Sequence, residues 1–101
     1  MELIDYNFEW DDDKNEANIQ KHKISFLEAM TVFDDDNALY KPDTDHSQDE
    51  ERFIIIGISA SIRLLVVCHC YRESDTVVRI ISARKANRQE WNQYGGGLYE
   101  G

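Results

Sequence analysis

The sequence predicts an α+β domain built from an antiparallel sheet of about four strands, two N-terminal helices and one C-terminal helix. Three features predict this class: helix-like stretches with start signals within residues 12–33, three strand-like runs joined by short turns within residues 52–83, and a helical stretch that ends at three glycines. Short turns indicate an antiparallel meander, and this order of elements places the helices on one face of the sheet. A chain of 101 residues suits one core, so we expect a single domain over residues 1–94 and a flexible glycine-rich tail over residues 95–101.

The first elements are a short strand and a capped helix. Residues 6–10 alternate and are aromatic, which favours a strand. Asp11 is placed to cap a helix over residues 12–21, and two further aspartates in the first turn suit the positive end of the helix dipole. Lys21, His22 and Lys23 follow at the negative end, where cations are favourable.

A second helix is predicted over residues 26–33. Ser25 and Glu28 have the spacing of a capping box. Apolar residues then recur at helical spacing, so one face of this helix is expected to be buried. These apolar residues are Phe26, Ala29, Met30 and Phe33.

The rest of the chain is predicted to contain the sheet and the last helix. A short edge strand over residues 38–42 precedes a polar loop over residues 43–51, which is rich in turn formers. Apolar, β-branched runs then predict three strands, and the polar stretch after them predicts a helix. The strands cover residues 52–59, 63–71 and 76–83, and the helix covers residues 84–94 and therefore contains Arg84 and Lys85.

Charge is divided unequally along the chain. The formal net charge is -9, but residues 1–51 contain 4 Lys and no Arg against 16 Asp and Glu, whereas residues 52–101 contain 6 Arg and 1 Lys against 4 acidic residues. The fold could therefore present a basic face on an acidic body, which is the feature that binds polyanions. The alternative is that the arginines are scattered and only keep the sheet soluble.

The sequence contains no signal for a membrane or for secretion. No apolar run approaches the roughly 18 residues that span a bilayer. The N-terminal stretch MELIDYNFEW lacks the basic start and the apolar stretch of a signal peptide. We therefore expect a cytoplasmic protein without a membrane partner.

The two cysteines predict buried thiols. Cys68 and Cys70 are two residues apart in a predicted strand, where their backbones are poorly placed for a mutual disulfide. No further cysteine pair completes a tetrahedral zinc site. Free cysteine behaves as a small apolar residue, so a structural role is favoured over a metal site.

Clusters of acidic residues are weak candidates for a metal site. The aspartate runs at residues 11–13 and 34–36 would suit magnesium. Helix capping and helix termination explain both runs better. Asp45, His46 and Asp49 could form a metal or acid–base cluster, but a solvated loop is favoured. No metal and no other cofactor is therefore expected.

The hairpin formed by the last two predicted strands suggests a chemical site. If three residues, 73–75, close this hairpin, His69 lies opposite Arg79 and shares a solvent-facing side of the sheet with Tyr71. A neutral imidazole accepts a proton near pH 7, and a guanidinium holds a phosphate through two hydrogen bonds. Cleavage of RNA by its own 2′-hydroxyl needs a base, a phosphate clamp and a proton donor. The alternative is that both residues only cover the sheet.

Four blocks, in this order and spacing, resemble the BrnT family of toxins from bacterial type II toxin-antitoxin modules. The resemblance extends over residues 8–94. The blocks are FEWDDDKNEANIQKHKISFLEA, DTDHSQDEER from Asp43 to Arg52, RLLVVCHCYR, and RIISARKANRQEW.

The resemblance implies a small RelE-like α+β ribonuclease. Such a toxin inhibits translation by cleaving RNA and is neutralised by a BrnA-type antitoxin. It also implies a hetero-oligomer with the antitoxin, which binds operator DNA and represses the operon, so the toxin would reach DNA only through its partner.

Matching the blocks to this sequence gives the candidate site. The resemblance and the hairpin chemistry together give three catalytic residues. His69 is the general base or acid, and Arg79 and Arg84 bind the phosphate and stabilise the transition state. Substrate contacts implied by the matched positions are Lys21, His22, Arg52, Arg72 and Lys85; Ser82 also falls in the last block. The predicted function is thus a metal-independent endoribonuclease toxin.

Two departures from the family pattern leave alternatives open. Lys23 stands where relatives usually have glycine after Lys-His, so this corner is strained or turns differently. The last helix is nearly neutral and the net charge is -9, which weakens RNA binding because affinity grows with the number of phosphates neutralised. The main alternative is a weak or inactive member that mainly binds the antitoxin in a repressor complex; a metal-dependent nuclease is a third possibility.

Overall fold

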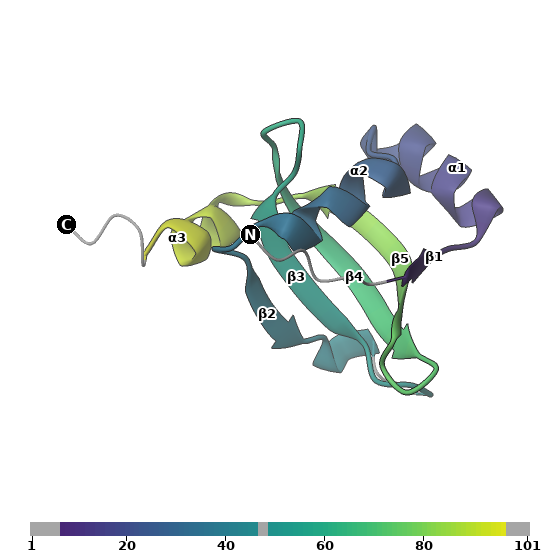
Figure 1. Ribbon diagram of the computed structural model, residues 1–101. Coiled ribbons are helices and arrows are strands. Elements are labelled where there is room, and N and C mark those ends of the chain that lie inside the picture. Colours follow the sequence, from purple (N-terminus) through teal and green to yellow (C-terminus); the bar gives the residue numbers. More distant parts are fainter. Residues whose placement is uncertain (1–6, 47–48, 97–101) are drawn as a thin grey trace.

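The computed structural model describes residues 7–46 and 49–96. Its helices and strands follow the predicted order of one strand, two helices, the sheet and a last helix (Figure 1). The elements are β1 (Asn7–Glu9), α1 (Asp12–His22), α2 (Phe26–Thr31), the 3-10 turn η1 (Val32–Asp34), β2 (Leu39–Pro42), the 3-10 turn η2 (Thr44–His46), β3 (Phe53–Ile58), β4 (Leu64–Arg72), β5 (Val77–Lys85) and α3 (Arg88–Gly96).

The sheet differs from the predicted one in strand number and in direction. It has five strands in the order β1-β5-β4-β3-β2, instead of about four. The strands β2 to β5 form the predicted antiparallel meander. The strand β1 pairs with β5 in parallel, so the sheet is mixed. The helices α1 and α2 connect the two opposite edge strands, β1 and β2.

Both predicted N-terminal helix caps are confirmed. The Asp11 carboxylate accepts a hydrogen bond from the Lys14 backbone N–H, and the Ser25 hydroxyl accepts one from that of Glu28. In a full capping box the Glu28 carboxylate would also accept from the Ser25 backbone N–H. Here it instead accepts hydrogen bonds from Arg63 and Ser59. The second helix is also shorter than predicted and continues as η1.

The corner between α1 and α2 has the left-handed geometry that glycine favours. Lys23 adopts φ 61° and ψ 33°, and its backbone N–H donates to the carbonyl of Ile19. A residue in this conformation reverses the chain directly after a helix. Lys23 therefore adopts the backbone turn that a glycine would form at lower conformational cost.

The core lies on both faces of the sheet. One face packs against α1, α2 and η1. The helices α1 and α2 lie over this face of the sheet (Figure 1). The other face is covered near Leu64 by α3, where Tyr94 packs in a second, smaller cluster, so the prediction that the helices share one face is wrong for α3. The first cluster contains Ile24, Phe26, Ala29, Val32, Phe33, Ile55, Leu65, Val67, Val78, Ile80 and Ala83. We call this the helix face and the other the open face.

The hairpin between β4 and β5 has a longer turn than predicted. Residues 73–76 form a four-residue loop, so Arg72 pairs with Val77 and His69 pairs with Ile80. The predicted pairing of His69 with Arg79 is therefore wrong by one residue, because Cys70 pairs with Arg79. A slip of one residue moves a side chain to the other face of the sheet. A further irregularity in the ladder leaves Ile81 as an extra residue on β5.

The last helix begins later than predicted. The strand β5 continues through Arg84 and Lys85, and Asn87 then caps α3. The Asn87 side chain accepts from the Glu90 backbone N–H, while the Glu90 carboxylate accepts from the Asn87 backbone N–H, which is a capping box. The helix continues to Gly96, so it does not stop before the glycines. The rest of the predicted tail, residues 97–101, lies outside the described residues.

Among the described residues, no helix combines the length and the apolar character needed to cross a membrane.

The turn between β3 and β4 suggests a stability test. Ile62 adopts φ 60° although it is β-branched, and 80% of it is exposed. Glycine avoids the steric cost of this conformation and little packing is lost, so Ile62→Gly is expected to stabilise the fold by about 1 kcal/mol. Thermal unfolding followed by circular dichroism should show an increase in Tm of about 4–8 °C. The matched control is Ser61→Gly, one residue away outside the left-handed region, which should not raise the Tm.

Candidate functional site

A hollow of about 250 Å³ on the open face contains arginine and carboxylate side chains. It lies where the start of β3, the middle of β4 and the second half of β5 come together with the loop after β2. Its base is formed by side chains of the three central strands. The lining residues are Asp43, Asp45, Arg52, Ile54, Val66, Cys68, Ile81, Ser82 and Arg84. We call it the open-face pocket.

The β2–β3 hairpin places Asp43 beside Arg52. The ladder between the two strands ends at the pair Pro42 and Phe53, and one more hydrogen bond, of 2.9 Å, runs from the Asp43 backbone N–H to the Arg52 carbonyl. Asp43 is 8% exposed, which is unusual for a carboxylate and reflects its position at the base of the loop. The hairpin therefore fixes one carboxylate and one guanidinium at the same end of the pocket.

The irregular second half of β5 places Ser82 and Arg84 in the pocket. Ser82 pairs with Cys68 and Arg84 with Val66, so their side chains project from the open face. The Arg84 guanidinium is held by two hydrogen bonds of 2.8 Å, from Nη1 and Nη2 to the two carboxylate oxygens of Glu90. Since Glu90 also caps α3, this helix fixes the orientation of Arg84.

Electrostatics keep this ion pair charged. The hydrogen bond to Glu90 raises the pKa of Arg84, burial opposes the shift, and the nearby Asp43 carboxylate adds to it. The hydrogen bond from Arg84 lowers the pKa of Glu90 against a smaller opposing effect of burial. The pocket therefore presents charges of both signs, and the Arg84 guanidinium interacts with the carboxylates of both Glu90 and Asp43.

Cys68 lies in the pocket as a neutral thiol. Burial raises the pKa of its thiol to about 12, and the neighbouring Asp43 carboxylate, whose Oδ2 is 3.5 Å from Sγ, adds to the shift. A thiol, unlike a thiolate, is a weak nucleophile and a poor metal ligand. Cys68 and Cys70 are both free, and Cys70 is buried in the sheet.

His69 lies in the core and not on the solvent-facing side of the sheet. It is fully buried on the helix face, and its ring packs edge-on against Phe33 at 4.9 Å between centroids. Nδ1 is 3.2 Å from the Val67 carbonyl, so this nitrogen donates, and Nε2 is 3.3 Å from the Tyr71 hydroxyl. Burial lowers the pKa of His69 to about 4, only partly opposed by the Val67 hydrogen bond. The predicted surface shared by His69 and Arg79 is therefore not formed.

Two other predicted arginines are bound to carboxylates outside the pocket. Arg79 lies on the open face opposite Cys70, but its Nη1 donates to Glu9 of β1 at 2.8 Å. Arg72, at the end of β4, donates to Glu50 at 3.2 Å, and both side chains are exposed. Neither arginine lines the pocket.

The remaining predicted substrate contacts do not line the pocket either. Lys21 and His22 are at the end of α1, which packs on the helix face. Lys85 pairs with the core residue Leu65, and its charge contributes to lowering the pKa of Glu28 in α2. Of the eight predicted site residues, the structure brings together Arg52 and Arg84.

Sequence reasoning missed Asp43, which stands at the start of the block DTDHSQDEER within the predicted polar loop. It considered Asp45 only as part of an acid–base or metal cluster and favoured a solvated loop. Asp45 lines the pocket, so the loop that contains it is part of the site. The spacing of Asn87 and Glu90 was the available signal for a helix start after Arg84.

The arrangement can bind an anion between two guanidinium groups. Arg52, directly before β3, and Arg84, on β5, both line the pocket, and guanidinium groups bind phosphate through paired hydrogen bonds. Asp43 supplies a proton-accepting oxygen in the same pocket. Within residues 7–46 and 49–96, no group of three or more metal-binding side chains is placed to hold a metal ion.

Comparison with known proteins identifies a family and a similar solved structure. Residues 10–90 match the model of the family described as "Ribonuclease toxin, BrnT, of type II toxin-antitoxin system". The crystal structure of the Brucella abortus ribonuclease toxin BrnT is similar, with a TM-score of 0.63 and 21% sequence identity; the alignment covers 83% of this chain and 100% of the other. The curated proteins include no match to this chain.

Proposed function

The chain belongs to the BrnT family of ribonuclease toxins of type II toxin-antitoxin systems, and we propose from this premise that it is a metal-independent endoribonuclease that cleaves RNA in the open-face pocket. The observation that supports the site is the convergence of Arg52, Arg84 and Asp43 on one hollow of about 250 Å³. Guanidinium groups bind phosphate, so this pocket is expected to bind the phosphate backbone of RNA in preference to a neutral substrate.

The proposed chemistry uses the ribose of the substrate as the nucleophile. Arg52 and Arg84 hold the non-bridging oxygens of one phosphate and stabilise the charge that develops on it. The Asp43 carboxylate acts as the general base, the role predicted for His69, and accepts the proton of the 2′-hydroxyl. The 2′-oxygen attacks the phosphorus, the 5′-oxygen leaves, and a 2′,3′-cyclic phosphate forms. Water supplies the proton that the leaving oxygen needs.

The first test of this proposal is incubation of the purified protein with single-stranded RNA. We expect cleavage products that end in a 2′,3′-cyclic phosphate, formed equally well in EDTA, because no step requires a metal ion. Separation of the products on denaturing gels, with and without EDTA, measures this. Activity that EDTA abolishes would contradict metal independence.

A second candidate function is supported by the ion pairs. Within the described residues, four arginines bind carboxylates: Arg63, Arg72, Arg79 and Arg84. Paired arginines neutralise fewer phosphates, so RNA affinity is expected to be low. In this alternative the protein is a weak or inactive nuclease that acts mainly as the antitoxin's partner in a transcriptional repressor. Intact RNA together with tight antitoxin binding would favour it.

The proposed biological setting follows from the family. Cleavage of RNA in the cytoplasm would inhibit translation, and a BrnA-type antitoxin would neutralise the toxin in a hetero-oligomer. The complex would bind operator DNA through the antitoxin. The acidic N-terminal half, with 16 Asp and Glu among residues 1–51, suits a basic partner.

A further inference from the structure

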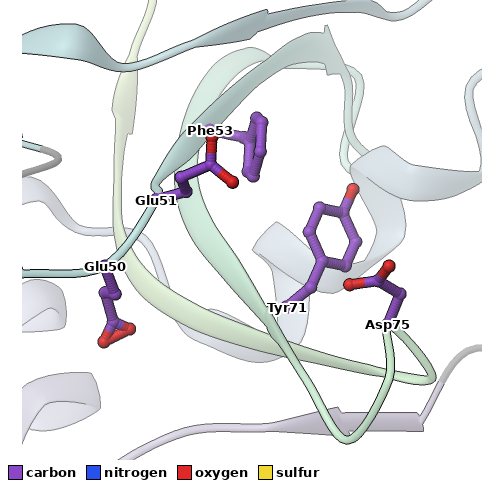
Figure 2. A pocket seen from close by; sticks show the side chains of 5 residues that line it. All are labelled: Glu50, Glu51, Phe53, Tyr71 and Asp75. Atoms are coloured by element: carbon purple, nitrogen blue, oxygen red, sulfur yellow. The ribbon is translucent and has the colours of Figure 1, made fainter.

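A larger hollow, of about 570 Å³, lies at the other end of the sheet from α3 and has no role in the proposed cleavage. It is lined by Glu50, Glu51, Phe53, Tyr71 and Asp75 (Figure 2). Phe53 and Tyr71 project from the helix face, whereas the open-face pocket is on the opposite side of β3 and β4. We call this hollow the aromatic pocket.

Two aromatic rings form the wall of the aromatic pocket. The centroids of Phe53 and Tyr71 are 5.5 Å apart and the rings are inclined by 60°, so they form an open angle. The Tyr71 hydroxyl lies 3.3 Å from Nε2 of the buried His69, which fixes the orientation of the ring. The aromatic surface is therefore held in place before any ligand binds, and aromatic faces attract cations.

Two carboxylates complete the pocket on either side of the rings. Figure 2 shows the carboxylates of Glu51 and Asp75 next to Phe53 and Tyr71, whereas Glu50 points away from them. The Glu50 side chain is bonded to Arg72. Glu51 and Asp75 form no ion pair with any described residue, and both are exposed. The pocket therefore holds two negative charges that the described part of the chain does not neutralise.

We propose that the aromatic pocket receives an arginine side chain from a basic segment of the partner antitoxin. Aromatic faces beside carboxylates match a guanidinium, which stacks on rings and donates two parallel hydrogen bonds to a carboxylate. A net charge of -9 on the toxin favours a basic protein partner over a nucleic acid at this surface. That the partner is an antitoxin rests on the proposed function; that the ligand is a guanidinium rests on the pocket.

The test uses the full chain and a peptide with one arginine, acetyl-Ser-Gly-Arg-Gly-Ser-amide, followed by NMR of the aromatic ring signals. We expect saturable shifts at Phe53 and Tyr71, and none with the peptide that has glutamine in place of arginine. Glu51→Gln with Asp75→Asn removes both charges with little change of shape, and asparagine tolerates the left-handed φ of 68° at position 75. This double variant should weaken peptide binding by about fivefold.

The matched control is Glu16→Gln with Asp36→Asn, which removes the same charge from exposed positions elsewhere. It should weaken binding by less than about twofold, because distant exposed charges are screened. Equal weakening by both double variants, or the absence of shifts at Phe53 and Tyr71, would overturn the proposal. Since no RNA is present, this outcome is independent of whether the open-face pocket cleaves RNA.

Discussion

Replacing Arg84 with alanine is expected to lower kcat/KM for RNA cleavage by about 100- to 1,000-fold, the usual effect of removing a charged group that stabilises a transition state. Arg84 lines the pocket, and Glu90 fixes the orientation of its guanidinium by binding both terminal nitrogens at 2.8 Å. This bidentate contact leaves Nε–H and the second Nη2 proton for a phosphate. Initial rates with a fluorescent RNA substrate would measure the loss.

Two further variants show whether the loss is specific. Arg88→Ala removes the same charge from an exposed position four residues further along the chain, outside the pocket, and should change kcat/KM by less than about threefold. Arg84→Lys keeps the charge but not the fork of donors, so an intermediate loss is expected. An Arg84→Ala enzyme that is folded and as active as Arg88→Ala would refute the role of Arg84.

Acidification from pH 7 to pH 4 is expected to lower the free energy of unfolding by about 3 kcal/mol through His69 alone. Burial lowers the pKa of His69 from 6.5 to about 4 in the folded state. Between these values the unfolded chain binds a proton that the folded chain does not bind. The contribution of His69 to the free energy of unfolding is therefore fully present above pH 6.5 and is lost as the pH falls toward 4. Urea unfolding at a series of pH values measures the change.

The variant His69→Gln isolates this effect. Glutamine does not titrate and retains a donor and an acceptor for the Val67 carbonyl and the Tyr71 hydroxyl. The variant should be less stable at pH 7 but nearly independent of pH between 4.5 and 6.5. Hydrogen bonds from arginine lower the pKa values of Glu28 and Glu90 in the folded protein. Below this pH window, protonation of these two carboxylates therefore destabilises both proteins further. A wild-type protein that is equally stable at pH 7 and pH 4.5 would contradict the buried, neutral His69.

Local signals predicted most of the fold. Asp11 and Ser25 cap the helices that their side chains indicated, because capping depends on bonds within one turn. The strands β3, β4 and β5 follow the apolar runs that predicted them. The parallel contact of β1 with β5 was missed because it joins residues 70 positions apart, such as Glu9 and Arg79, and no local pattern encodes that pairing.

The candidate site was predicted less well, because it depends on register. A turn of four residues instead of three moved Arg79 away from His69, and three successive residues, 73–75, adopt positive φ without a glycine to signal it. Arg84 and Arg52 were found through their position in the family blocks. Asp43 was missed because its burial arises from the contact between the β2–β3 hairpin and Cys68 of β4, which is a tertiary feature.

The most direct test of the proposed site is an NMR titration of the arginine Nε–Hε signals with an RNA whose 2′-hydroxyls are methylated and which therefore cannot be cleaved. We predict that the signals of Arg52 and Arg84 shift together and saturate with a single dissociation constant, because both side chains line the open-face pocket. The signals of Arg63, Arg72 and Arg79 are expected to remain in place, because these side chains lie outside it. Saturable RNA binding that leaves Arg52 and Arg84 unshifted, or that shifts the other arginines instead, would contradict the open-face pocket as the RNA site.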